Sequence, residues 1–193
     1  MITKICFARH GRTNANEQMV IQGRIDNQLN DNGISDAHQI AAIIKQNNLI
    51  FDVAICSPLK RAQKTANIIL HELNQNIDII VNDLFVEREF GEAEGLPITP
   101  ENYQLILDDC FCGMETKSEL CARSKKALEY LLTNYSGKNI LVVAHSHFIK
   151  SLFMQYLPDV KFNTTFGHLG LSYLIFDDDK NIAAVFNTKK VNF

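Results

Sequence analysis

The sequence lacks the features that would assign the chain to a membrane, a secretory route or nucleic acid. No apolar run reaches the roughly 18 residues of a membrane-spanning helix, so no membrane association is expected. The N-terminus has no charged start followed by an apolar core and a cleavage site, so no signal peptide is expected. Lys and Arg number 19 against 22 Asp and Glu, which provides no basic face for nucleic acid.

The five cysteines show no pattern of disulfides or metal ligands. Cys6 and Cys56 lie in apolar runs typical of strands, where a free thiol behaves as a small apolar side chain. Cys110 and Cys112 are spaced like half of a metal site, but no second pair at a suitable spacing accompanies them. We therefore expect free thiols in a reducing, cytoplasmic location, and neither a metal ion nor a cofactor.

No internal repeat, low-complexity tract or linker divides the 193 residues, of which 46% are hydrophobic. A single domain over residues 1–193 is the expectation. Short apolar strands are predicted at residues 3–8, 53–56, 77–81 and 139–144, followed by a hairpin at 171–176 and 182–186.

Helical patterns alternate with these strands. They are predicted at residues 31–47, from Ser57 onward with Ser57 as N-cap and Pro58 in the first turn, at 118–134 and at 146–156. Fully apolar strands that alternate with helices predict a three-layer α/β/α sandwich with a mostly parallel sheet.

The stretch from residue 82 to residue 117 is irregular and rich in glycine and proline. It predicts a small cap or lid at about 88–117 that covers a binding site. Four aromatic residues in it either form an apolar wall for the substrate or belong to the core: Phe85, Phe90, Tyr103 and Phe111.

Cationic and imidazole side chains follow three of the predicted strands. Arg9 and His10 come directly after the first strand, Arg61 lies near the start of the helix after the second, and His145 follows strand 139–144. Open α/β sheets bind ligands at the carboxyl ends of their strands. Arginine suits phosphate oxygens, and a neutral histidine is a nitrogen nucleophile. A phosphate site is therefore predicted, with Glu87 nearby.

Other interpretations of these residues stay open. Taken singly, His145 could be a capped buried histidine, Arg61 a solvated surface residue and Glu87 one of several loop carboxylates. A metal-dependent hydrolase would use His10, His145 and His147. A non-catalytic phosphate-binding module is a further alternative.

Five motifs spread over the chain carry a resemblance to a known family. They are RHGRT at residues 9–13, IQGRIDNQLNDNG at 21–33, SPLKRAQKTA at 57–66, EREFGEAEG at 87–95 and VVAHSH at 142–147. In this order they resemble the histidine phosphatase superfamily, the phosphoglycerate mutase-like group.

The resemblance implies a phosphatase that hydrolyses a small phosphorylated metabolite through a phosphohistidine, without a metal. His10 is then the phosphorylated residue and Glu87 the proton donor, and a bound phosphate that favours protonated Glu87 predicts an acidic-to-neutral pH optimum. The other implied phosphate- or substrate-binding residues are Arg9, Asn16, Gln22, Gly23, Arg61, His145 and Ser146.

A phosphoglycerate mutase is the alternative within the family. By resemblance, glycolytic mutases carry longer insertions over the site, whereas here only residues 96–112 separate Gly95 from Gly113, and Gln22 looks more like the phosphatase branch.

Ser146 and His147 depart from the family pattern, which has a glycine directly after the histidine that corresponds to His145. His168 either lines the pocket or caps the terminal hairpin. The substrate is not specified, and a homodimer is the expectation from base rates.

Overall fold

The computed structural model describes residues 1–178 and 180–190, and within them six strands form one sheet in the order β3-β2-β4-β1-β5-β6. The strands are β1 Ile2–Arg9, β2 Val53–Cys56, β3 Ile79–Val81, β4 Asn139–Ala144, β5 Leu171–Asp177 and β6 Lys180–Thr188. Strands β1 to β4 pair in parallel, whereas β5 and β6 are antiparallel. The prediction of a mostly parallel sheet is confirmed.

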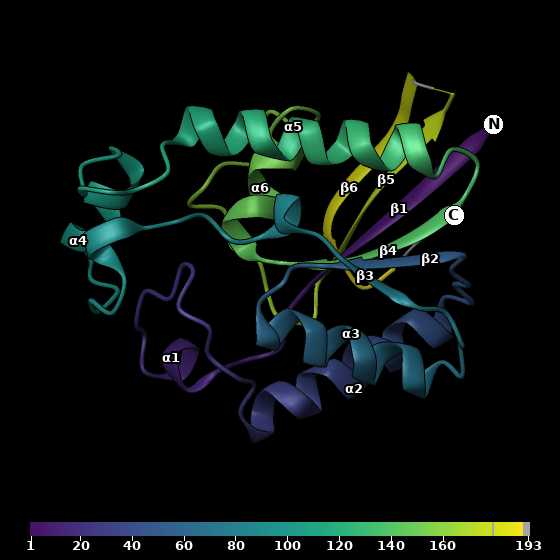
Figure 1. Cartoon of the computed structure of the whole chain (residues 1–193), viewed down its shortest axis with the longest axis horizontal. Helices are drawn as coiled ribbons and strands as arrows, with labels where there is room; N and C mark the ends of the chain where they lie inside the picture. Colours follow the sequence, from purple (N-terminus) through teal and green to yellow (C-terminus); the bar gives the residue numbers. More distant parts are fainter. Residues whose placement is uncertain (179, 191–193) are drawn as a thin grey trace.

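Helices cover both faces of the sheet (Figure 1). Helices α2 (Asp31–Gln46) and α3 (Lys60–Glu72) lie on one face, and α5 (Lys117–Asn134) and α6 (Ser146–Phe153) lie on the other. The three-layer α/β/α sandwich is therefore confirmed. No helix among the described residues is long and apolar enough to cross a membrane.

The alternation of side chains along the strands explains why the strands are apolar throughout. Ile5 and Phe7 of β1 pack into the core beside α5 and α6, whereas Cys6 and Ala8 pack into the core beside α2 and α3. All four are fully buried. A strand covered on both faces needs an apolar residue at every position, because its side chains alternate between the two cores.

Some predicted boundaries are wrong. Helix α3 begins at Lys60 with Leu59 as its N-cap, so Ser57 does not cap it. The Ser57 hydroxyl instead accepts a bond from the main-chain N–H of Leu59 and contacts His145. Strand β3 begins at Ile79 rather than Ile77, and helix α6 ends at Phe153 rather than at Tyr156.

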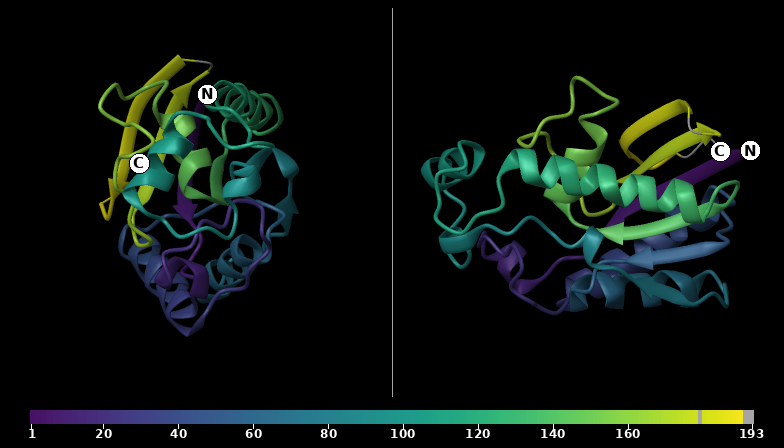
Figure 2. Two further views of the ribbon diagram at one scale, coloured as in Figure 1. Left: turned by 90° about the vertical axis from the view of Figure 1, so that its left-hand side faces the viewer. Right: turned by 45° about the horizontal axis from the view of Figure 1, so that its top comes forward.

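The predicted cap contains a helix that the sequence interpretation missed. Thr99 caps α4 (Pro100–Leu107) by accepting a bond from the N–H of Asn102, and Pro100 occupies the first turn. The short turns η1 (Asp83–Phe85) and η2 (Gly91–Ala93) precede it. Figure 2 shows this segment at the end of the molecule opposite the N-terminus, beyond the carboxyl ends of the parallel strands.

The cap has an apolar cluster of its own, formed by Ile21, Phe90, Ala93 and Ile106. Phe111 packs against this cluster, whereas Phe85 belongs to the main core. Because Ile21 comes from the loop after β1, the cap is packed onto that loop. A single domain over residues 1–193 stays a prediction.

The loop after β1 is fixed against the start of α2. Arg12 donates two bonds of 2.8 Å to the carboxylate of Asp36, and its main-chain oxygen lies so close to Gly33 that a Cβ there would overlap it. The main-chain N–H of Gly11 donates to the hydroxyl of Thr65 on α3. These contacts hold the residues that follow the strand, including His10, against two helices. The same loop contains the short helix α1 (Asn14–Glu17).

Candidate active site

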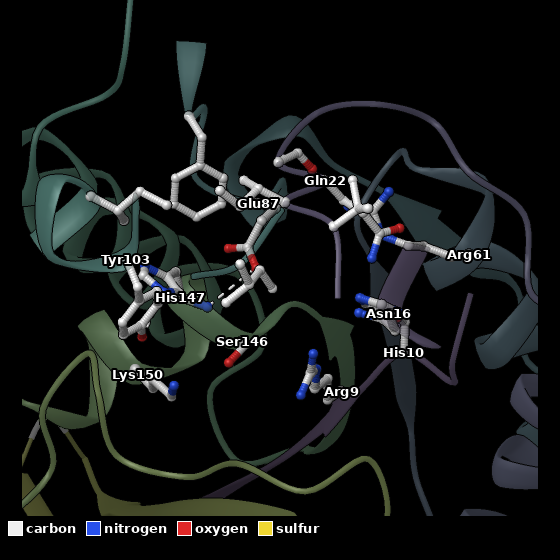
Figure 3. Close-up of a pocket in the computed structure, with 16 residues that line it drawn as sticks. Arg9, His10, Asn16, Gln22, Arg61, Glu87, Tyr103, Ser146, His147 and Lys150 are labelled. Carbon is white, nitrogen blue, oxygen red and sulfur yellow. Dashed lines mark hydrogen bonds between the residues drawn. The ribbon is translucent and has the colours of Figure 1, made fainter. Parts of the chain in front are cut away.

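A cavity of about 170 Å³ lies at the carboxyl ends of the parallel strands, beneath the cap (Figure 3). Eight of the nine site residues predicted from the sequence line it: Arg9, His10, Asn16, Gln22, Gly23, Arg61, Glu87 and Ser146. The ninth, His145, is not among the lining residues; it is fully buried, with its ring centroid 5.0 Å from that of His10.

His10 is held as a neutral ring with one free nitrogen. Its Nδ1 lies 2.7 Å from the main-chain oxygen of Gly11, a contact in which Nδ1 must carry the proton and donate it. The Nε2 atom then keeps its lone pair. Burial, together with the charge of Arg61, places the pKa of His10 well below its usual range. A lowered pKa favours the uncharged, nucleophilic form of the ring.

Arg9 and Arg61 supply positive charge, and within the part of the chain that the structure describes no carboxylate lies within ion-pair distance of either. Arg9 donates to the main-chain oxygen of Phe166 at 2.8 Å, and Arg61 donates to those of Ile25 and Gly23 at 2.7 Å each. The Nε atoms of both arginines are buried without a partner among the described residues. Burial lowers the pKa of Arg61 to about 10, so it remains charged at neutral pH. The two guanidinium groups fit an anion, which would offset their charge.

His145 is oriented by Ser57. The Ser57 hydroxyl lies 2.7 Å from His145 Nε2 and accepts a weaker bond from the main-chain N–H of Leu59 at 3.3 Å. A hydroxyl that accepts from Leu59 can donate its own proton to Nε2, which leaves the ring proton of neutral His145 on Nδ1. Burial, and then the charge of Arg61, lowers the pKa of His145 well below its usual range.

A hydrogen-bond network through Thr13 orients the two amide side chains of the cavity wall. The Thr13 hydroxyl donates to Gln22 Oε1 at 2.7 Å, and the Thr13 main-chain N–H donates to Asn16 Oδ1 at 3.1 Å. Both oxygens are thereby engaged, and the amide NH₂ groups are the ends that remain for a ligand. Gly23 contributes its main-chain oxygen, which accepts from Arg61.

Glu87 is held by the start of helix α6. Its Oε1 accepts from the N–H groups of Arg88 at 2.9 Å and Phe148 at 3.0 Å, and its Oε2 accepts from that of His147 at 3.2 Å. Oε2 thus accepts one bond fewer than Oε1 and has capacity left toward the cavity. Glu94, from the same carboxylate-rich stretch, does not line the cavity. Its carboxylate accepts hydrogen bonds from the main-chain N–H groups of Arg24 and Phe90.

Lys150 was missed as a site residue by the sequence interpretation, although it lines the cavity. Its one available signal is a charged residue in the helical stretch 148–153, in which four of the other five residues are apolar. Lys150 is 5% exposed, and its Nζ donates to the main-chain oxygen of Phe162 at 2.9 Å. Burial lowers the pKa of Lys150 to about 8.

His147 and Tyr103 also line the cavity, but His168 does not. The Tyr103 hydroxyl donates to the Phe162 main-chain oxygen at 2.8 Å. Of the four aromatic residues of the cap, Tyr103 and Phe90 line the cavity, whereas Phe85 belongs to the main core. His168 Nδ1 lies 3.0 Å from the main-chain oxygen of His10, so His168 helps to hold the backbone of His10 in place.

The geometry does not favour the three-histidine metal site. The ring of His147 packs against Phe90 and Phe162, with centroids 5.1 Å from each. Across residues 1–178 and 180–190, no group of three His, Cys, Asp or Glu side chains is placed to hold a metal ion.

Comparison with known proteins gives a consistent result. The model of the histidine phosphatase superfamily (branch 1) matches residues 5–189. A Bacillus subtilis protein described as an uncharacterized phosphatase, PhoE, is 36% identical over 151 residues, which cover 78% of this chain and 76% of that protein. A 2,3-bisphosphoglycerate-dependent phosphoglycerate mutase of Parvibaculum lavamentivorans is 30% identical over 166 residues, covering 78% of each chain.

Among solved structures, phosphoserine phosphatase of Entamoeba histolytica in complex with 3-phosphoglyceric acid superimposes with a TM-score of 0.80. The sequence identity is 28%, and the match covers 96% of this chain and 97% of that one. The fold, the motifs and these matches together show that the chain belongs to the histidine phosphatase superfamily (branch 1).

Proposed function

We propose that the protein is a metal-independent phosphatase that hydrolyses a small phosphomonoester through a phosphohistidine at His10. The observation that carries this proposal is the state of the His10 ring. Its Nδ1 proton is committed to Gly11, so Nε2 is a free nucleophile beside two guanidinium groups that form no ion pair among residues 1–178 and 180–190.

In the first step, His10 Nε2 attacks phosphorus while the bond to the ester oxygen breaks. Phosphoryl transfer needs in-line geometry and compensation of charge on the equatorial oxygens. Arg9 and Arg61 supply that compensation from fixed positions. Glu87 Oε2 gives a proton to the departing alkoxide, so the products are an alcohol and phosphohistidine.

In the second step, water attacks the phosphohistidine. Glu87, now ionised, takes a proton from the water as the N–P bond breaks, and inorganic phosphate leaves. The three main-chain N–H groups that hold Glu87 keep its carboxyl group in place through both steps. His10 and Glu87 return to their starting protonation states.

Phosphoglycerate mutase is the second candidate, because a mutase is among the relatives at 30% identity. The two activities share the first step and differ in whether water or a second hydroxyl group accepts the phosphoryl group. The phosphatase is favoured by the Bacillus relative at 36% identity and by the small size of the cap.

The test uses His10→Ala with His71→Ala as its control, since His71 is exposed on α3. We expect His10→Ala to lose phosphate release from an aryl phosphate and from phosphorylated metabolites. The parent protein and His71→Ala should hydrolyse both and form an acid-labile phosphoenzyme, with rates unchanged by a chelator. Equal rates for His10→Ala and the parent would refute the nucleophile, and isomerisation of phosphoglycerate faster than phosphate release would favour the mutase.

A further inference from the structure

The cavity has a second polar end, away from the proposed phosphate site. Figure 3 shows Arg9, His10, Asn16 and Arg61 toward one side, and Tyr103, His147 and Lys150 toward the other. Glu87 and Ser146 are drawn between them. The proposed phosphate chemistry uses the first group and leaves the second without a role.

Lys150 is the main anomaly at this second end. It is 5% exposed, and its ammonium group donates to one main-chain oxygen, that of Phe162. Among the described residues, no carboxylate lies within ion-pair distance of it. A buried charge without an opposite charge is costly, and the cost is relieved when an anion binds beside it.

Two polar neighbours of Lys150 at this end are His147 and Tyr103. The Nδ1 atom of His147 is buried and has no partner among residues 1–178 and 180–190. The hydroxyl of Tyr103 shares the Phe162 oxygen with Lys150 and lies 3.5 Å from His147 Nε2. Because the Tyr103 hydroxyl donates its proton to Phe162, it can only accept from His147 Nε2, so Nδ1 of the neutral ring keeps a lone pair and does not donate to an anion. The donor that this end offers to an anion is therefore the Lys150 ammonium group.

Five other residues that line the cavity are apolar: Val20, Ile21, Phe90, Ile98 and Ile106. A substrate that fits this arrangement has a phosphate at one end, a short carbon chain, and a second anionic group at the other end. Lysine binds such a group as a point charge, whereas the arginines that suit phosphate by their planar fork lie at the first end.

Building on the proposed phosphatase activity, we propose that Lys150 binds a carboxylate of the substrate, so that the preferred substrates are small phosphorylated carboxylic acids. Lys150 thereby determines specificity without taking part in phosphoryl transfer. The structure of a related phosphatase with bound 3-phosphoglyceric acid supports the substrate class but assigns no residue of this chain.

The test compares substrates that differ only at the second end. 3-Phosphoglycerate is paired with glycerol 3-phosphate, and phosphoserine with phosphoethanolamine, because the second member of each pair lacks the carboxylate. We expect the parent protein to show a kcat/KM about 10- to 100-fold higher for the acid, the factor expected of a hydrogen bond to a charged group.

Lys150→Met preserves the approximate volume and removes the charge. Lys150→Met should lower kcat/KM for the acids about 10- to 100-fold, mainly through a higher KM. It should leave kcat/KM unchanged for glycerol 3-phosphate and phosphoethanolamine, the neutral partners, so named because they lack the negative charge of the carboxylate. Lys150→Arg should keep most of the preference. Lys64→Met, which removes an exposed lysine of α3, is the matched control and should behave as the parent.

An equal kcat/KM for acid and neutral partner in the parent would overturn the assignment, as would a Lys150→Met variant that keeps the preference. A stronger preference for a second phosphate than for a carboxylate would also overturn it. These results are separate from failure of the phosphatase proposal, in which His10→Ala hydrolyses an aryl phosphate as fast as the parent. Activity on the neutral partners verifies that each Lys150 variant is folded.

Discussion

Removing the Ser57 hydroxyl tests whether the position and tautomer of His145 matter for the proposed reaction. In Ser57→Ala, His145 Nε2 loses its partner at 2.7 Å in a fully buried site. A buried polar atom left unsatisfied costs about 1–3 kcal/mol. For a chain of this size, each kcal/mol shifts the melting temperature by about 2–4 °C, so a loss of about 2 kcal/mol lowers it by about 4–8 °C.

The expected effect on catalysis has a different cause. Without the hydroxyl proton on Nε2, the ring no longer has to keep its own proton on Nδ1. The neutral ring can then present a lone pair there, whereas the phosphate-binding role predicted for His145 from the sequence requires a hydrogen-bond donor. Loss of one such donor in the transition state is worth about 2–3 kcal/mol, so we expect kcat for an aryl phosphate to fall about 30- to 150-fold.

The control for Ser57→Ala is Ser151→Ala on helix α6. Ser151 is as buried as Ser57, but its hydroxyl donates at 2.7 Å to the main-chain oxygen of Phe148 in its own helix. We expect Ser151→Ala to lower the melting temperature slightly and to leave kcat within about twofold. A Ser57→Ala variant with reduced stability and unchanged kcat would refute the link between His145 and catalysis.

Two further predictions concern stability. Alanine normally stabilises a helix relative to glycine by about 1 kcal/mol, but in Gly33→Ala the new Cβ overlaps the main-chain oxygen of Arg12, so urea denaturation should show a net loss of about 1–3 kcal/mol. Burial lowers the pKa of His168 from 6.5 to about 4, so the unfolded chain binds more protons between these pH values and the folded state loses stability as pH falls below about 6.5. His168 alone accounts for about 1.4 kcal/mol of this loss in the free energy of unfolding at pH 5.5. In His168→Gln that part of the loss should disappear, so the melting temperature should fall less steeply with acid than in the parent. An unchanged slope would contradict the assignment.

Local patterns in the sequence were sufficient for the sheet and for the residues at the strand ends. Strand β4 was predicted with its observed bounds because every residue from Ile140 to Ala144 is apolar, as a strand buried on both faces requires. Arg9 ends such a strand and His10 follows it directly, so their place at the carboxyl edge of the sheet follows from chain connectivity. The motifs identified the family for the same reason, since each is a short contiguous segment.

Helix α4 was missed although Thr99 and Pro100 are a valid helix start. The helix is short, and among its residues Ile106 alone is buried, so it lacks the repeating apolar positions by which longer helices are predicted. The N-cap predicted at Ser57 failed for a related reason. A serine before a helix has several partners available, and the sequence does not show that His145 is one of them.

The sequence by itself determined the sheet, its layers and the group of residues expected to hold phosphate, because strand periodicity and the polar residues at strand ends are local properties of the chain. Tertiary structure alone decided that Ser57 faces His145, 88 positions further along the chain. It also decided that Lys150 is buried in the cavity wall, with no carboxylate of the described residues within ion-pair distance. The physical reason is that the protonation and partners of a buried polar group depend on which distant segments pack against it, and no local pattern encodes that packing.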